Sequence, residues 1–86
     1  MRNQATFQAE DVFSIEGKGI IITGKLTNGF LTKGMKAIIN GKQSEILSIE
    51  SHNQLLESLT TGTRAGLLLS NIEKNDIQKD GSYFFE

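Results

Sequence analysis

The sequence lacks cysteine altogether. Without cysteine the fold has neither a disulfide framework nor a thiolate metal site, so apolar burial and hydrogen bonding must hold it together. Long apolar runs are missing too, because the longest, "GIII" and "GLLL", are far too short to span a bilayer. The N-terminal stretch "MRNQATFQAED" has no apolar core of the kind that a signal peptide needs. We therefore expect a cytoplasmic protein that does not contact a membrane.

The chain also has little positive charge and little length. Nine Lys and Arg residues face ten Asp and Glu residues, a net charge of −1, whereas proteins that bind nucleic acid through phosphates usually carry a basic excess. With 86 residues the chain forms one domain, 1–86, with a modest core. A core of that size leaves no room for a deep substrate cleft, which argues against an enzyme.

What is present is a period-two pattern of apolar residues, which indicates strands and no helix. Thr6–Ile15 reads as a long strand with an irregularity near Asp11, and Ile20–Leu26 as a second strand. The pairs Asn28-Gly29 and Asn40-Gly41 each predict a tight turn. Residues 52–64 read as a polar connection and 73–78 as a short turn. Further strands are expected at 35–40, 43–51, 65–72 and 82–86. The pattern predicts an all-β fold, a small closed antiparallel β-barrel of six to seven strands.

Three candidate sites for chemistry fail on their context. The sequence "GKG" at 17–19 is followed by a strand, whereas a phosphate-binding loop needs a helix there. His52 is the only histidine, and no motif supplies it with metal co-ligands or with a nucleophile. Glu10 and Asp11 point to opposite faces of a regular strand. We therefore expect no enzymatic activity, no cofactor, no metal and no nucleotide binding by this chain alone.

One charge asymmetry stands out. Five lysines fall between Gly17 and Ser44, a segment without any Asp or Glu. They either keep strand edges soluble or create a local positive face for RNA or for an acidic protein. Phe30 is the single aromatic residue in this segment, which disfavours recognition of bases by stacking. These lysines are Lys18, Lys25, Lys33, Lys36 and Lys42.

The order of motifs resembles the second domain of translation elongation factor Tu and its relatives. The resemblance covers about residues 10–81 and rests on "VFSIEGKG", "TGKLTNGFLTKG" and "GLLLSNIEKNDIQKDG". It implies a six- to seven-stranded barrel that, in the full-length factors, packs beside a GTP-binding domain and helps to hold the aminoacylated end of tRNA. The sequence shows none of the GTP-binding motifs. The resemblance places Glu50 near the pocket for the terminal adenosine of tRNA.

Several polar positions depart from the family. Where the family has basic residues after Glu50, this chain has His52, Asn53 and Gln54, and the Arg that follows "LLL" is missing. We therefore expect a non-catalytic binding module that docks a partner protein through exposed apolar residues such as Phe30 or Leu31. The alternatives are an RNA-binding module, for tRNA or ribosomal RNA, and a piece of a larger translation GTPase. The start at Met1 and the end near the family's closing strand argue against a piece. The predicted binding residues are Lys18, Lys25, Lys33, Lys36, Glu50, His52 and Arg64.

Overall fold

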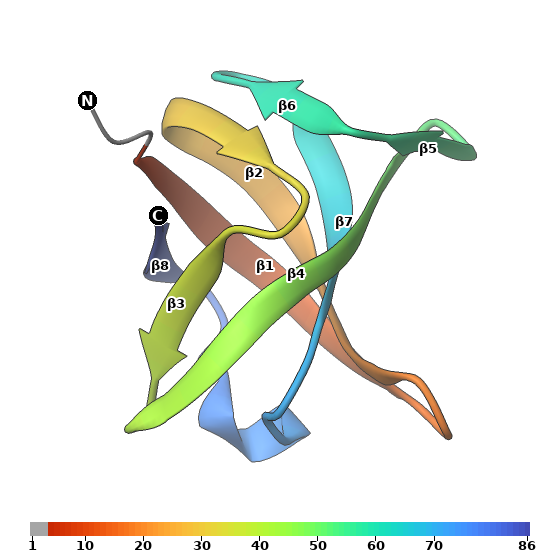
Figure 1. Cartoon of the computed structure of the whole chain (residues 1–86), viewed down its shortest axis with the longest axis vertical. Coiled ribbons are helices and arrows are strands. Elements are labelled where there is room, and N and C mark those ends of the chain that lie inside the picture. Colours follow the sequence, from red (N-terminus) through yellow and green to blue (C-terminus); the bar gives the residue numbers. More distant parts are fainter. Residues whose placement is uncertain (1–3) are drawn as a thin grey trace.

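A computed structural model describes residues 4–86, which form eight strands and a single helical turn (Figure 1). Strands β1 and β2 are long and the others shorter. The turn η1 lies between β7 and β8. The bounds are β1 Ala5–Ile15, β2 Gly19–Thr32, β3 Lys36–Ile39, β4 Lys42–Ser51, β5 Gln54–Leu56, β6 Ser58–Thr60, β7 Arg64–Leu69, η1 Lys74–Asp76 and β8 Gly81–Phe85.

Six of these strands make a nearly closed antiparallel barrel. Their order in the sheet is β3-β4-β7-β2-β1-β8, while β5 pairs with β4 and β6 pairs with β2. The two ends of this order meet at one point, where Lys36 and Glu86 exchange two backbone N–H···O=C hydrogen bonds of 2.9 Å. The predicted all-β barrel is confirmed, with six strands in its wall.

The core fills the inside of the barrel and follows the period-two pattern. In β2, Ile20 and Ile22 are buried while Ile21 between them is only half-buried, and β7 alternates in the same way around Leu68. Alternate residues of a strand point to opposite faces, so one face of each strand is apolar and buried. The largest fully buried side chains are Phe7, Ile22, Leu26, Leu31, Ile39, Ile46, Ile49, Leu67, Leu69 and Phe85.

The irregularity predicted near Asp11 is confirmed as a bulge. The register of β1 against β2 shifts between Ala9 and Asp11, opposite Gly24. A Cβ at Gly24 would stand 1.8 Å from the backbone oxygen of Gln8. Only glycine allows β1 to approach β2 so closely here, and the bulge adds local bending to the wall.

Only one of the two Asn-Gly pairs forms the predicted turn. Asn40-Gly41 forms the predicted turn between β3 and β4, and both residues have positive φ, 52° and 79°. The turn predicted at Asn28-Gly29 is wrong, because both residues lie within β2. Gly29 uses its positive φ of 84° beside a register shift between Thr6 and Phe7 of β1. The same backbone freedom that suits a turn here serves a β-bulge.

The connection predicted at 52–64 contains two short strands that sequence reasoning missed. His52 and Asn53 have positive φ, 53° and 62°, and turn the chain so that β5 pairs with β4. β6 then pairs with β2. Three-residue strands of mixed polarity carry too short a pattern to be recognised from sequence.

Candidate docking face

The outward surfaces of β4, β7, β1 and the part of β2 that pairs with β7, residues 20–25, form one continuous face, which we call the outer face. Cross-strand pairing aligns Phe13 with Ile21, Ile21 with Leu68, and Leu68 with Ser48. Phe13 is 46% exposed, and Ile21 and Leu68 are half-buried. Paired residues of neighbouring strands lie on the same side of a sheet. The outer face therefore carries a row of apolar side chains across three strands.

Next to this row lies a shallow hollow of about 420 Å³. Its floor is Gly66 of β7, which pairs with Thr23 of β2 on one side and Glu50 of β4 on the other. A Cβ at Gly66 would meet its neighbours at 3.6 Å or more, which is ordinary contact. The strand thus tolerates a side chain here, and its absence leaves the hollow open.

Three of the predicted binding residues line this hollow, although they are far apart in the sequence. Glu50, His52 and Arg64 belong to β4, the β4–β5 turn and the start of β7. The Arg64 guanidinium donates a hydrogen bond to the carboxylate of Glu10. Lys25 pairs with Arg64 in the β2–β7 register, so it lies beside the hollow. Four of the seven predicted residues are thus brought to one face.

The other three predicted lysines lie elsewhere. Lys18 stands in the β1–β2 turn, before β2 begins, and Lys33 follows the end of this 14-residue strand. Lys36 begins β3, where it pairs with Glu45 of β4 and bonds through its backbone to Glu86. Because β2 runs the length of the barrel between Lys18 and Lys33, the lysines do not gather into one positive face.

The two apolar residues expected to contact a protein, Phe30 and Leu31, differ in their exposure to solvent. Phe30 is 42% exposed and lies in the part of β2 that pairs with β6, outside the outer face. Leu31 is fully buried, so the expectation that it contacts a partner is wrong. Adjacent residues of a strand point to opposite faces, and Leu31 is the one that points inward. Sequence reasoning missed Ile21 and Leu68. Alternation within "III" and "LLL" puts each middle residue on the face opposite to its two neighbours, and those neighbours are buried.

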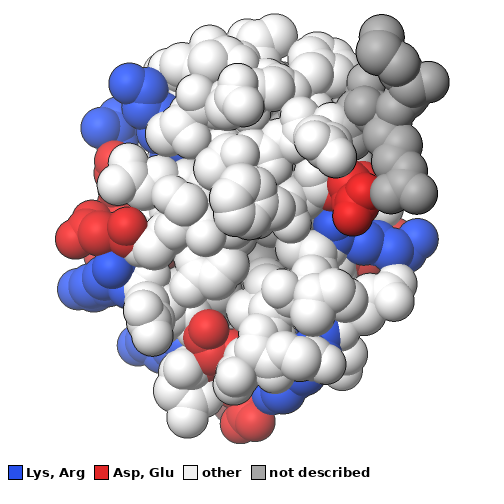
Figure 2. Space-filling view, turned by 90° about the vertical axis from the view of Figure 1, so that its left-hand side faces the viewer, with Lys and Arg blue, Asp and Glu red and all other residues white. Residues whose placement is uncertain are grey.

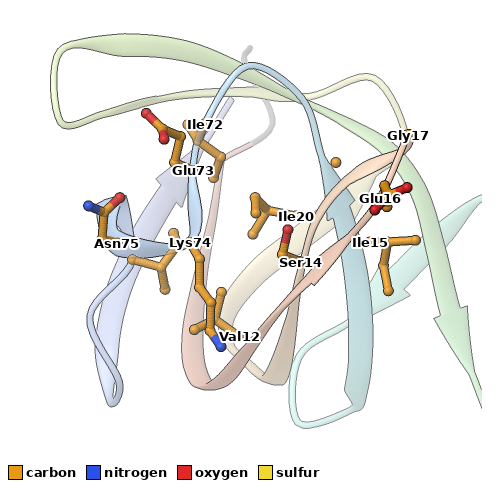
Figure 3. A pocket seen from close by; sticks show the side chains of 12 residues that line it. Val12, Ser14, Ile15, Glu16, Gly17, Ile20, Ile72, Glu73, Lys74 and Asn75 are labelled. Carbon is orange, nitrogen blue, oxygen red and sulfur yellow. The ribbon is translucent and has the colours of Figure 1, made fainter.

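A larger depression, of about 770 Å³, lies at the end of the barrel between the β1–β2 turn and η1 (Figure 3). Apolar side chains, among them Val12, Ile20 and Ile72, line its inner part, and Glu73 and Asn75 come from the η1 side. The other polar side chains in its lining are those of Ser14, Glu16 and Lys74.

The η1 side of the barrel is held by a polar cluster. Lys42 Nζ and Asn40 Nδ2 each donate a 2.7 Å hydrogen bond to the carboxylate of Asp76, and the backbone N–H of Glu73 donates one of 2.8 Å. These hydrogen bonds lower the pKa of Asp76 from 3.8 to about 2, and the bond from Lys42 has the largest effect. Asp76 therefore ties the β3–β4 turn to η1 as a structural anion.

Within residues 4–86, no helix is long and apolar enough to cross a membrane. No three His, Asp or Glu side chains of those residues cluster as metal ligands would.

Comparison with known proteins agrees with this architecture. Translation elongation factor SelB from Methanococcus maripaludis, in its apo form, matches with a TM-score of 0.83 and 17% identity, over 94% of this chain and 18% of that one. A bacterial selenocysteine-specific elongation factor, EF-Sec, matches with a TM-score of 0.80 and 19% identity, over 96% and 14%. The chain thus spans less than a fifth of either protein. The sequence profile described as Elongation factor Tu domain 2 matches residues 19–79. The chain belongs to the elongation factor Tu domain 2 family.

Proposed function

We propose that this domain is a non-catalytic module that docks a partner protein on its outer face, in the cytoplasm and in the context of translation. The coarse part of this statement, a translation-factor domain, follows from the family. The observation that supports a protein partner is the apolar row Phe13–Ile21–Leu68 across three strands.

The composition of the outer face suits a protein better than a polyanion. Protein interfaces combine an apolar centre with a polar rim. Here the rim contains carboxylates as well as cations, since Arg64 is paired with Glu10 and Glu50 borders the same hollow. Carboxylates beside a phosphate backbone would repel it, and the chain has no overall basic excess to compensate.

RNA is the second candidate, and one observation favours it. Glu50, which the family resemblance places near the terminal adenosine of tRNA, borders a hollow that is open because Gly66 has no side chain. A flat, partly apolar hollow with nearby hydrogen-bonding groups can accept a splayed base. In this case binding would depend on Arg64 and Lys25 and would weaken steeply with salt.

The test is capture of partners from the protein's own cell lysate by the tagged chain, with and without ribonuclease. The variant Phe13→Glu places a charge in the apolar row, and Phe30→Glu is its matched control, because the two phenylalanines are exposed to similar extents, 46% and 42%. For a protein partner we expect Phe13→Glu to reduce capture at least about tenfold, as loss of an interface anchor does, and Phe30→Glu to retain it.

Ribonuclease separates the two candidates. Capture of one protein that survives ribonuclease and depends on Phe13 supports the proposal. Capture that disappears with ribonuclease, and that falls when Arg64 and Lys25 are changed together to Glu, replaces it with RNA binding. Equal losses in Phe13→Glu and Phe30→Glu would show that the outer face is not the docking surface.

A further inference from the structure

The barrel is incompletely closed on the side opposite the outer face. In the order β3-β4-β7-β2-β1-β8, the junction of β3 with β8 lies across the barrel from the β7–β2 pair. We call this junction the seam. Within residues 4–86, β3 forms a ladder with β4 and β8 forms one with β1, but β3 and β8 form none with each other. The two hydrogen bonds between Lys36 and Glu86 join the strands at one end.

Past this point, no strand within residues 4–86 pairs with the side of β3 or β8 that faces the seam. In an antiparallel strand, alternate residues direct their N–H and C=O to the same side. Because Lys36 and Glu86 point theirs across the seam, Ile38 of β3 and Phe84 and Ser82 of β8 do so too. Continuing the register would pair Ile38 with Phe84, yet the sheet contains no such pair. Two sheet edges thus lie next to each other, and among residues 4–86 no ladder joins them.

The side chains at the seam are apolar and exposed. Ile38 is 70% exposed and Phe84 74% exposed, although both belong to strands. They line one groove of about 370 Å³ together with Lys36 and Gln43, and another of about 730 Å³ that continues toward η1. Natural sheet edges are usually protected by charge, proline or a covering segment. The five residues of β8, Gly81–Phe85, include neither a charged residue nor a proline.

Charge around the grooves indicates what kind of chain fits there. Figure 2 views the side of the molecule on which β3 and β8 lie, and its centre is free of charged side chains, which sit mainly toward the margins. The polar residues that line the longer groove are mostly neutral, such as Asn40, Asn75, Gln78 and Ser82. Its one acid besides Glu86 is Asp76, which is already bonded to Lys42. Because the lining of the longer groove contains no Lys or Arg, this groove gives no attraction to a polyanion.

We infer that the seam is a second docking site, which takes an uncharged extended peptide segment of a partner as an added strand on the free edge of β8. The peptide backbone bonds to the N–H and C=O of Ser82 and Phe84, and apolar side chains at alternate peptide positions pack on Phe84 and Ile38. This is the β-augmentation mode, in which main-chain bonds supply affinity and alternate pockets supply specificity. Because β8 has five residues, the recognised segment is about four residues long.

This site is independent of the proposed function, since it lies on other strands and uses backbone recognition. The test selects random 12-residue peptides from a display library on the intact chain. Enriched peptides are then remeasured as synthetic peptides on the unchanged chain and on the double variant Ile38→Lys, Phe84→Lys. Both positions are largely exposed, so the variant is expected to fold, which an amide NMR spectrum verifies. Phe13→Glu is the control for the outer face.

The expected result has three parts. Enriched peptides carry apolar residues at alternate positions, bind the double variant at least tenfold more weakly, and bind Phe13→Glu as they bind the unchanged chain. Methylating two alternate backbone nitrogens of the peptide, which removes hydrogen bonds without altering side chains, also costs at least tenfold. Bound peptide slows amide exchange at Ser82 and Phe84.

Four outcomes would overturn the inference. They are the absence of any enriched peptide, equal binding to the double variant, indifference to N-methylation, and dependence on Phe13. A dimer of the chain that dissociates on Ile38→Lys, Phe84→Lys would assign the seam to a second copy and would also overturn the peptide assignment. None of these results decides the lysate experiment on Phe13, so the two proposals fail separately.

Discussion

The outer face and the seam are built from the same kind of strand but differ in how the strands are joined. On the outer face, β4, β7, β2 and β1 are joined by ladders that only bulges interrupt, with ten paired positions between β1 and β2. At the seam, two edges share one pair of hydrogen-bonded residues, Lys36 and Glu86. A closed wall can recognise a partner only through side chains. An open edge can also recognise a partner through hydrogen bonds to its backbone.

The largest expected difference between the two kinds of wall is in stability. Phe7 of β1 is fully buried and Phe84 of β8 is 74% exposed. Phe7→Ala leaves a cavity in the core and is expected to lower the free energy of unfolding by about 3–5 kcal/mol. Phe84→Ala, the matched substitution, is expected to change it by about 0.5 kcal/mol or less. Urea unfolding measures both, and a large loss at Phe84 would mean that the seam is packed shut.

Two glycines of the outer-face strands give the next largest contrast. Gly24→Ala puts a Cβ 1.8 Å from the Gln8 oxygen, and we expect a loss of about 2 kcal/mol or more from overpacking. Gly66→Ala meets ordinary contacts and is expected to stay within about 0.5 kcal/mol of the unchanged chain. Thermal unfolding compares them. If Gly66→Ala is as destabilising as Gly24→Ala, the hollow is a packing requirement and not an open surface.

A smaller effect concerns the polar cluster at η1. The folded-state pKa of Asp76, about 2, lies below its ordinary value of 3.8. Its contribution to stability is therefore fully present above about pH 4 and is lost as the pH falls toward 2. Asp76→Asn removes this contribution, so the free energy of unfolding should fall less between pH 4 and pH 2 in the variant. Parallel slopes for the two proteins would exclude a stabilising Asp76 anion.

The smallest expected effect is a difference in amide exchange within the unchanged chain. Amide hydrogens of Ile38 and Phe84 face the seam, whereas those of Ile22 and Leu67 lie in strands paired on both sides. We expect the first two to exchange with solvent at least about a hundredfold faster, because unpaired edge amides need no global opening. Hydrogen exchange followed by NMR measures all four. Equal protection would show that the barrel closes fully in solution.

The sequence predicted the wall of the barrel well because its signals are local. Period-two alternation identified the principal strands, and the irregularity near Asp11 and the turn at Asn40-Gly41 are found where expected. Asn28-Gly29 failed because positive φ serves a turn and a bulge equally. Which of them forms depends on whether β1 runs alongside. The β1 partners of Asn28 and Gly29 are Thr6 and Ala5, which lie 22 and 24 residues away in the chain, beyond any local pattern.

The candidate site was predicted less completely for the same reason. Glu50, His52 and Arg64 share a hollow only because β4 pairs with β7 in one particular register. Lys18 and Lys33 appeared clustered in the sequence, yet β2 separates them in space. The seam has no sequence signature at all, because it follows from two edges that approach without pairing.

The pairing of Ala5 with Phe85 has a mechanical consequence. A pull that separates the two ends of the described chain acts on one end of the β1–β8 ladder, so its hydrogen bonds break one after another, as in a zipper. Strands pulled in this way resist far less force than strands sheared along their length. Tension would therefore peel β8 away first and widen the seam while the rest of the barrel stays intact. The strand that borders the seam, β8, is therefore also the strand that an external load reaches first.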